Sequence, residues 1–401
     1  MDYNIIIVSL SICIVLSYLF NEIAKRTNVP SVLMLIVAGV ILGQVLKFFP
    51  EYNVDFFPSL KILGTIGLIM IVLEGALDLE LTKEKSGLIG KATLLAVLGI
   101  IGSILFIAPI FHFLLNMDIG LSLLYATPLA VISSAIVLPS VVSLNEYDKE
   151  LLIYESCISD IIGIMVFNLI LSIMQTQEVQ GSISDFGIEF LITVAISFVI
   201  GIGLVLLFKF LNAKVKLFFF ISILILIYAL GKMIHLSPLV MILMFGLILK
   251  NHKLFFIGPL KNLMTRMEFK KMEKDFHIIS RETAFVLRTF FFIVFGLTID
   301  LLSLINFEVL IISLMVFISI YLVRIVLLKV FEKEGSPILG YIAPRGLITI
   351  LLFYSIPKDL LSETFQPGVL LWVIILTSIY MTYGLIKHVK GAEIEHEVDS
   401  H

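Results

Sequence analysis

Charged residues are scarce in this chain. Asp, Glu, Lys and Arg make up 15% of its 401 residues, whereas about 25% is usual in a soluble domain. Apolar residues make up 59%, and the mean hydropathy is +1.10. Because so few polar side chains cannot cover a water-facing surface, we expect an all-α polytopic membrane protein that faces the lipid bilayer.

Cysteine and metal-binding patterns are also nearly absent. The two cysteines, Cys13 and Cys157, lie in apolar runs, where we interpret them as packing residues and predict no disulfide. No CxxC, CxxH or HExxH pattern occurs, so we predict no cofactor and no metalloenzyme. We expect no cleavable signal, because the first apolar run is followed by Lys25 and Arg26 rather than by small residues.

Apolar stretches of about 20 residues, separated by polar segments, predict about thirteen transmembrane helices. They lie near 4–23, 31–48, 59–78, 88–114, 118–144, 150–175, 184–210, 216–233, 236–250, 280–300, 305–330, 335–356 and 367–388. With the N-terminus outside, most Lys and Arg residues fall in inner loops, which predicts a cytoplasmic C-terminus.

Two polar segments lie outside these spans. Segment 252–275 mixes basic and apolar residues at roughly helical spacing, so we expect it to lie along the inner membrane surface and to join two halves of the protein. Residues 391–401 are polar and too few to form a domain. We therefore expect one transmembrane unit over 1–390 with a short cytoplasmic tail, no nucleotide-binding domain and no nucleic-acid partner.

Prolines interrupt the fifth and the twelfth predicted spans. In LLYATPLAV, Pro128 cannot donate to the carbonyl of Leu124, and Thr127 adds a hydroxyl beside it. In GYIAPRGLITI, Pro344 and Arg345 stand together inside an apolar run. Each break alone is also compatible with an ordinary proline kink.

The spacing of the two breaks is more specific. Spans that are seven apart cross the bilayer in opposite directions. Two antiparallel interrupted helices at corresponding places are typical of a transporter built from inverted repeats, whose binding site lies where the breaks cross. We therefore predict inverted six-helix repeats with two crossed discontinuous helices.

The sixth predicted span carries a polar stripe within YESCISD. Glu155, Ser156, Ser159 and Asp160 share one face of a helix. A charged carboxylate inside the membrane is costly unless it is paired or hydrated. We favour a cation site for Asp160 and a structural ion pair for Glu155, with a permanently protonated acid as the alternative.

Buried arginines provide candidate partners for these acids. Arg324 lies in the eleventh span and Arg345 at the second break, whereas Arg288 near the inner end of the tenth span is expected to extend to the surface. Three acids are candidate partners: Glu155, Asp160 and Glu74. The sequence leaves open which arginine neutralises Glu155.

Oxygen atoms dominate this set of groups, and Na⁺ and K⁺ prefer oxygen ligands. An accessible aspartate that binds either a cation or a proton, but never both, produces obligatory exchange. Partial burial favours the neutral acid, so the proton can compete with the cation. Such a residue suffices for antiport without covalent chemistry.

At these residues the chain resembles the monovalent cation/proton antiporter superfamily, and within it the sodium/proton exchangers of the NhaP and NHE type. The matching segments occur in order along nearly the whole chain: VLEGALDLE, ATPLAV, ESCISD, FFFIVFGLTIDL, YLVRIV and APRGLITI. The resemblance implies an NhaA-like antiporter fold in a bacterial or archaeal cell membrane.

The resemblance also implies roles for individual residues. Asp160 corresponds to the aspartate that exchanges cation for proton, and the other ion-binding residues would be Ser156, Thr127 and Glu74. The structural residues would be Glu155, Ser159, Arg324, Arg345, Pro128 and Pro344, with Glu155 pairing with Arg324 and Arg345 bracing the crossing. The family further implies a homodimer with a dimerisation part near 1–80 and 184–300 and a moving core near 88–175 and 305–388.

One position departs from the family pattern. Ser159 stands where the family has asparagine or aspartate, so no second titratable acid lies beside Asp160. We therefore predict electroneutral exchange of one cation for one proton. Na⁺ is the expected cation, a potassium-preferring antiporter is the alternative, and Li⁺ also remains open. An intramembrane enzyme is the alternative from another class, but an aspartyl protease needs two deep aspartates and Asp160 stands alone.

Overall fold

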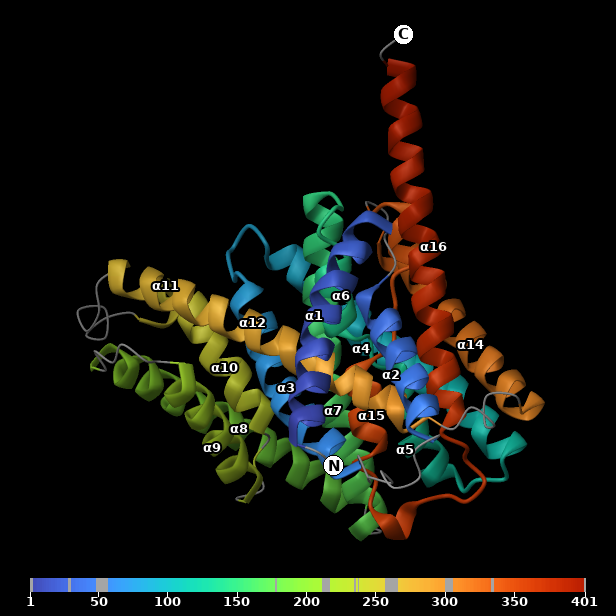
Figure 1. Ribbon diagram of the computed structural model, residues 1–401. Helices are drawn as coiled ribbons and strands as arrows, with labels where there is room; N and C mark the ends of the chain where they lie inside the picture. The colour runs from blue at the N-terminus through green and yellow to red at the C-terminus, as the bar shows by residue number, and fades with distance from the viewer. Residues whose placement is uncertain are drawn as a thin grey trace. The chain divides into compact units, whose positions relative to one another are not determined.

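The protein is described by a computed structural model over residues 3–27, 30–47, 57–176, 179–210, 217–233, 236, 238–256, 266–299, 306–332 and 335–399. All regular elements in these ranges are helices (Figure 1), which confirms the all-helical class there. The first eight are α1 (Tyr3–Thr27), α2 (Ser31–Lys47), α3 (Phe57–Asp78), α4 (Ser86–Leu114), α5 (Ile119–Ala130), α6 (Ser134–Ser140), α7 (Glu146–Thr176) and α8 (Val179–Phe210). Then follow α9 (Leu217–Met233), α10 (Pro238–Lys250), α11 (His252–Phe255), α12 (Arg266–Leu297), α14 (Phe307–Phe331), α15 (Leu347–Phe353) and α16 (Gly368–Asp399). Two short 3₁₀-helices span Pro337–Gly340 and Lys358–Leu360.

Six helical segments in the described ranges are long and apolar enough to cross a membrane: Ser86–Leu114, Ile119–Ser140, Glu146–Gln175, Leu191–Phe208, Phe307–Phe331 and Gly368–His388. Four shorter apolar segments accompany them, at Ser11–Ala24, Ser31–Val45, Phe219–Met233 and Pro238–Lys250. The composition and these helices identify the chain as an integral membrane protein. The count of thirteen spans stays a prediction.

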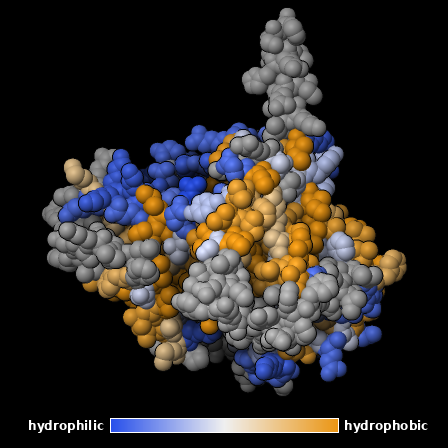
Figure 2. Space-filling view, in the orientation of Figure 1, coloured by the Kyte–Doolittle hydropathy of each residue, from blue (hydrophilic) through white to orange (hydrophobic). Residues whose placement is uncertain are grey.

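Apolar side chains are abundant on the surface. Val15, Leu105, Val199 and Ile318 are each more than half exposed, and Figure 2 shows broad apolar areas on the side in view. An aqueous surface rarely tolerates such areas. A lipid-facing surface favours them, because hydrocarbon solvates these side chains.

The chain divides into two compact units. Unit 1 comprises Met1–Gly64, Lys91–Gly163 and Val286–His401, and unit 2 comprises Thr65–Gly90 and Ile164–Phe285. This is a division by packing. The functional division into a dimerisation part and a moving core stays a prediction.

Unit 1 contains both helix interruptions that the prolines predicted. Helix α5 ends at Ala130 and α6 begins at Ser134, with Val131 and Ser133 in extended conformation. In the second interruption the 3₁₀-helix ends at Gly340, and α15 begins only at Leu347. The predicted span 335–356 is therefore less helical than expected, since a non-helical stretch separates its two short helices.

Unit 2 has an aromatic core contributed by four helices. Phe208 of α8, Phe220 of α9, Phe245 of α10 and Phe276 of α12 contact one another, and the rings of Phe220 and Phe276 stack at a centroid distance of 4.2 Å. Aromatic side chains bury large areas and pack well in such clusters. This cluster anchors the first half of α12 in unit 2.

The packing of α12 corrects one expectation from the sequence. Residues 266–275 were expected in a separate inner-surface segment, but they form the first turns of the same helix that continues to Leu297. Phe269, Met272 and Phe276 are buried at helical spacing. One face of this segment is therefore packed against protein, and this packing stabilises the helix on the N-terminal side of Phe276.

Candidate functional site

The two interruptions of unit 1 meet at a direct backbone contact. The N–H of Ser133 in the first donates to the carbonyl of Pro344 in the second, at 2.9 Å. Gly346 permits this approach, because a Cβ atom there would lie 2.7 Å from the Ser133 hydroxyl oxygen. Backbone groups that leave a helix inside a membrane need such partners. The interruptions therefore satisfy part of their hydrogen-bonding need through each other.

Arg345 joins the two interruptions more firmly. Its guanidinium donates to the carbonyls of Leu129 (2.7 Å) and Ala130 (3.1 Å) at the end of α5, and to that of Ala343 (2.7 Å). Its own N–H donates to the hydroxyl of Thr377 on α16, at 3.1 Å. The last carbonyls of a helix carry partial negative charge and lack intrahelical donors. The Arg345 guanidinium thus donates to backbone carbonyls. The sequence had led us to expect a carboxylate as its partner.

Asp160 lies on α7 beside the first interruption. It is 2% exposed, and the hydroxyl of Ser134 donates to its Oδ2 atom. Its Oδ1 atom is buried and has no hydrogen-bond partner among the described residues. Gly163, one turn further along α7, lets Val131 approach, because a Cβ atom at Gly163 would clash with the Val131 side chain at 2.1 Å. The Oδ1 atom of Asp160 is therefore available to bind a proton or a cation.

Glu155 forms a buried ion pair with Arg324 of α14. The two residues are 1% and 6% exposed, and the Arg324 Nε atom also donates to the carbonyl of Leu339 at 3.1 Å. A cavity of about 20 Å³ lies beside both side chains, which is room for one water molecule. The structure thus pairs Glu155 with Arg324, the choice that the sequence left open.

Ser159 supports the first interruption directly. Its hydroxyl oxygen accepts the backbone N–H of Ile132 at 3.0 Å, and Ser159 is 1% exposed. Ile132 lies between α5 and α6, where its N–H has no helical acceptor. A serine therefore suffices at this position to hold the extended segment against α7.

Two further hydroxyls predicted for ion binding are buried in unit 1. Thr127, next to Pro128 in α5, donates to the carbonyl of Leu123 at 2.8 Å. Ser156 of α7 donates to the carbonyl of Ile153 at 3.2 Å. Because each hydroxyl proton points to its own helix, the oxygen lone pairs stay available as acceptors.

Glu74 lies on α3 within unit 2. It is 7% exposed and therefore buried, as expected for a membrane-embedded acid. Asp160 belongs to unit 1. The participation of Glu74 in a site with Asp160 stays a prediction.

Two contacts were missed by reasoning from the sequence. Ser134 was not among the predicted site residues, yet its hydroxyl donates to Asp160. Arg288 was expected to extend to the surface, but it is 9% exposed and donates from Nη1 to the carbonyl of Ala135 in α6 at 2.6 Å. The signal for Ser134 was its position directly after a proline break. The contact of Arg288 joins positions 153 residues apart, so the local sequence could not reveal it.

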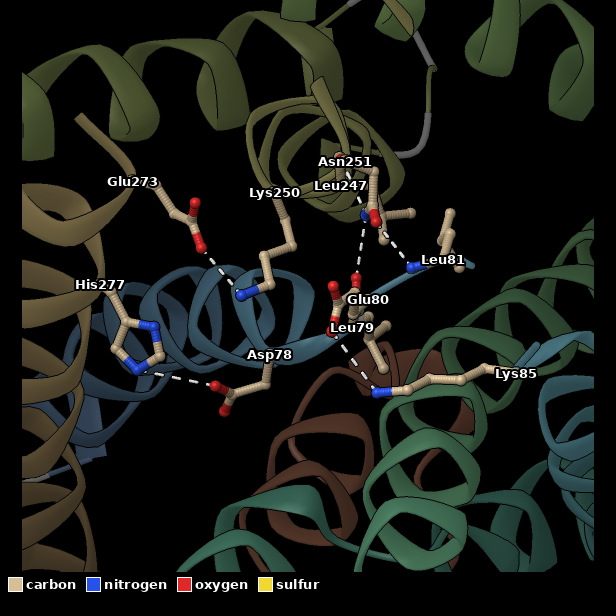
Figure 3. Close-up of polar contacts among 10 residues, drawn as sticks. All are labelled: Asp78, Leu79, Glu80, Leu81, Lys85, Leu247, Lys250, Asn251, Glu273 and His277. Atoms are coloured by element: carbon tan, nitrogen blue, oxygen red, sulfur yellow. Dashed lines mark hydrogen bonds and ion pairs between the residues drawn. The ribbon is translucent and has the colours of Figure 1, made fainter. Parts of the chain in front are cut away.

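Unit 2 has a separate polar cluster at the ends of α3 and α10 (Figure 3). The Asn251 amide donates to the carbonyl of Leu79 at 2.9 Å and accepts the N–H of Leu81 at 2.6 Å. It also donates to the carbonyl of Leu247 at 3.0 Å. One side chain thus supplies both a donor and an acceptor to the segment after α3 and ties it to α10.

Further polar contacts lie beside this amide, among them an ion pair of Lys85 with Glu80 at 3.5 Å (Figure 3). Lys250 contacts Glu273 of α12 at 2.8 Å, and His277 of α12 lies 3.6 Å from Asp78. These four side chains are 23% to 31% exposed, so solvent screens them more than the Glu155–Arg324 pair. Among the described residues, no group of three or more His, Cys, Asp or Glu side chains is placed to hold a metal ion.

Comparison with known proteins identifies the family and the fold. Residues 9–386 match the family model described as "Sodium/hydrogen exchanger, transmembrane". No curated protein sequence matches the chain. A structure of the sodium proton antiporter MjNhaP1 from Methanocaldococcus jannaschii at pH 8 is similar at a TM-score of 0.70 and 19% sequence identity, over 98% of each chain. An electron-microscopy map of the same antiporter is similar at a TM-score of 0.69 and 19% identity, over 98% of this chain and 97% of that one.

The structural likeness, at this identity, concerns the fold. The family model covers nearly the whole chain, including both interruptions, the acids of α7 and the buried arginines Arg288, Arg324 and Arg345. The sequence resemblance and the family match therefore agree. The chain is a member of the sodium/hydrogen exchanger family of transmembrane transporters.

Proposed function

We propose that the protein exchanges Na⁺ for H⁺ across the membrane by alternating access. Asp160 binds the cation when it is ionised and the proton when it is neutral. Since one carboxylate cannot hold both at once, each passage of a cation in one direction requires the passage of a proton in the other.

The observation that supports this most directly is the environment of Asp160. Its carboxyl group is buried, has one oxygen without a hydrogen-bond partner and has no ion-pair partner among the described residues. Arg324 is paired with Glu155, and the side chain of Arg345 donates to backbone carbonyls. An ionised carboxylate in such a place is costly, so a proton or a cation must balance it.

Further oxygen ligands complete the proposed site. Ser156 and Thr127 are buried hydroxyls in the same unit as Asp160, and Glu74 adds a second carboxylate by family resemblance. Na⁺ is a hard cation, and the proposed ligands are all oxygens. Glu155, Ser159, Pro128 and Pro344 serve the scaffold.

The stoichiometry is one cation for one proton. Ser159 is uncharged and its oxygen accepts a backbone N–H, while Glu155 is balanced by Arg324. Asp160 is thus the one acid of the stripe whose charge changes during the cycle. A clear dependence of the transport rate on membrane potential in proteoliposomes would contradict electroneutral exchange.

The proposed assembly is a homodimer in a bacterial or archaeal cell membrane, with the N-terminus outside and the C-terminus in the cytoplasm. The core near 88–175 and 305–388, built from inverted repeats, moves like an elevator against the dimerisation part near 1–80 and 184–300. The hydrogen bond between the interruptions supports a core that moves as one body, because it joins α5–α6 to the segment before α15.

The test is a dye-dequenching assay in vesicles that contain the purified protein. Na⁺, K⁺ and Li⁺ are added in turn across a pH series, beside Asp160→Asn as the matched variant. We expect Na⁺-dependent proton flux in the wild type and none in the variant, because an amide binds neither a proton nor a cation as a carboxylate does. Flux that survives in Asp160→Asn would refute the role of Asp160, and a response to K⁺ in place of Na⁺ would establish the potassium-preferring alternative.

A further inference from the structure

One carbonyl of α6 lacks its normal helical donor. In an α-helix the carbonyl of Ala135 accepts from the N–H four residues later. That residue is Pro139, which has no N–H and lies inside α6. Ala135 is 2% exposed. A buried carbonyl without a donor is costly inside a membrane, so a replacement donor is required here.

Arg288 is that replacement donor. Its Nη1 atom lies 2.6 Å from the Ala135 carbonyl oxygen, and the side chain is buried. A cavity of about 260 Å³ borders Pro139 and Ser140, but Ala135 does not line it. A water molecule in that cavity would therefore not reach the Ala135 carbonyl, and the guanidinium is its donor. A hydrogen bond from a charged group is stronger than one from a neutral group.

The bond lies next to the ion site. Ala135 follows Ser134, the residue whose hydroxyl donates to Asp160. A shift of the first turn of α6 would move both residues together. We propose that Arg288 is a positioning residue for the ion site, because it replaces the N–H that Pro139 lacks and thereby holds the turn that presents Ser134 to Asp160. This inference rests on the proposed function of Asp160, and it assigns Arg288, near the end of the proposed dimerisation part, to the moving core, in agreement with its packing in the same unit as Ala135.

An electrostatic role for Arg288 predicts the opposite sign. If its positive charge acted only through space, removing it would strengthen cation binding and lower the apparent KM for Na⁺. If Arg288 positions α6, removing its donors weakens the site and raises that KM. The sign of the change separates the two roles.

The experiment measures the effect of Arg288→Met in two backgrounds, wild type and Pro139→Ala. Alanine restores an N–H at position 139, and this donor can bond to the Ala135 carbonyl without Arg288. In the wild-type background we expect the apparent KM for Na⁺ to rise about tenfold, the equivalent of one hydrogen bond from a charged group, with a smaller change in maximal rate. In the Pro139→Ala background we expect a rise of no more than about twofold.

The control is Arg281→Met, which removes an exposed arginine from the same helix and leaves the apparent KM unchanged. Arg288→Lys retains a charge and a donor, so it keeps part of the affinity. An unchanged or lowered KM in Arg288→Met would overturn the inference. So would a tenfold rise that Pro139→Ala fails to reduce.

Two outcomes keep this test independent of the proposed function. If Asp160→Asn abolishes exchange while Arg288→Met has no effect, the positioning role fails and the function stands. If the wild type shows no exchange, the function fails, and the same four proteins are compared by apparent unfolding temperature in detergent without Na⁺. A smaller loss from Arg288→Met in the Pro139→Ala background then supports the hydrogen bond, and equal losses reject it. If the single variant Arg288→Met does not fold but the double variant Arg288→Met/Pro139→Ala does, the hydrogen bond is supported. If both of these variants fail to fold, the hydrogen bond is rejected.

Discussion

Glu155 and Asp160 lie five residues apart on α7, and both are buried. Around Glu155, the guanidinium of Arg324 provides a fixed opposite charge. Around Asp160, the described contact is a hydroxyl, that of Ser134, and one carboxyl oxygen has no partner. A charge with a permanent counter-charge belongs to the scaffold. A buried acid without one is either neutral or balanced by a bound cation, and our proposal assigns that exchange of proton and cation to Asp160.

The largest loss of stability is expected when the Glu155–Arg324 ion pair is disrupted. Arg324→Gln leaves Glu155 buried without its counter-charge, and loss of one partner of a buried pair costs about 3–5 kcal/mol. We expect a large fall in the apparent unfolding temperature. The double variant Glu155→Gln/Arg324→Gln removes both charges and should recover much of the loss. Equal losses in the single and double variants would contradict a fixed ion pair.

A smaller effect is expected at the backbone support between these two acids. Ser159→Ala removes the acceptor of the Ile132 N–H, and a buried donor without a partner costs about 1–3 kcal/mol. Ser319→Ala is the matched control, because that hydroxyl donates to a carbonyl of its own helix. The measurement is again the apparent unfolding temperature. Similar shifts in the two variants would show that Ser159 has no special part in holding the interruption.

A third effect lies in unit 2, where the ion pairs are partly exposed. Lys250→Gln removes the ion pair with Glu273, and the side chains of both residues are 23% exposed. Because solvent screens such pairs, we expect a loss of at most about 1 kcal/mol. The loss should shrink further at high salt. A loss as large as that of Arg324→Gln would end the contrast between the buried and the screened pairs.

Much of the architecture could be predicted from the sequence, for physical reasons. Scarce charge identified a helical membrane protein, and Pro128 and Pro344 located both interruptions, since proline acts on its own helix. The continuity of α12 through residues 266–275 was not predicted, because it depends on packing of Phe269 and Phe276 against other helices.

The site was less predictable than the fold. The sequence identified Glu155 and two possible arginines, but only the three-dimensional arrangement selects Arg324. It also gave no role to Arg288, whose acceptor is a backbone carbonyl. Backbone carbonyls have no sequence signal of their own. Proline is the exception, and Pro139 marks the acceptor four residues before it.

The smallest effect on stability is expected where the effect on transport is largest. Asp160→Asn keeps the size of the side chain and an acceptor for Ser134, so we expect only a small change in the apparent unfolding temperature without Na⁺. Added Na⁺ should stabilise the wild type, by about 2.7 kcal/mol at a hundredfold excess over the dissociation constant. The variant should show no such gain, because its amide has no charge for the ion to balance. Choline chloride at the same concentration controls for ionic strength. Stabilisation of Asp160→Asn by Na⁺ equal to that of the wild type would mean that the ion binds elsewhere, and the contrast between Asp160 and Glu155 would then lose its functional meaning.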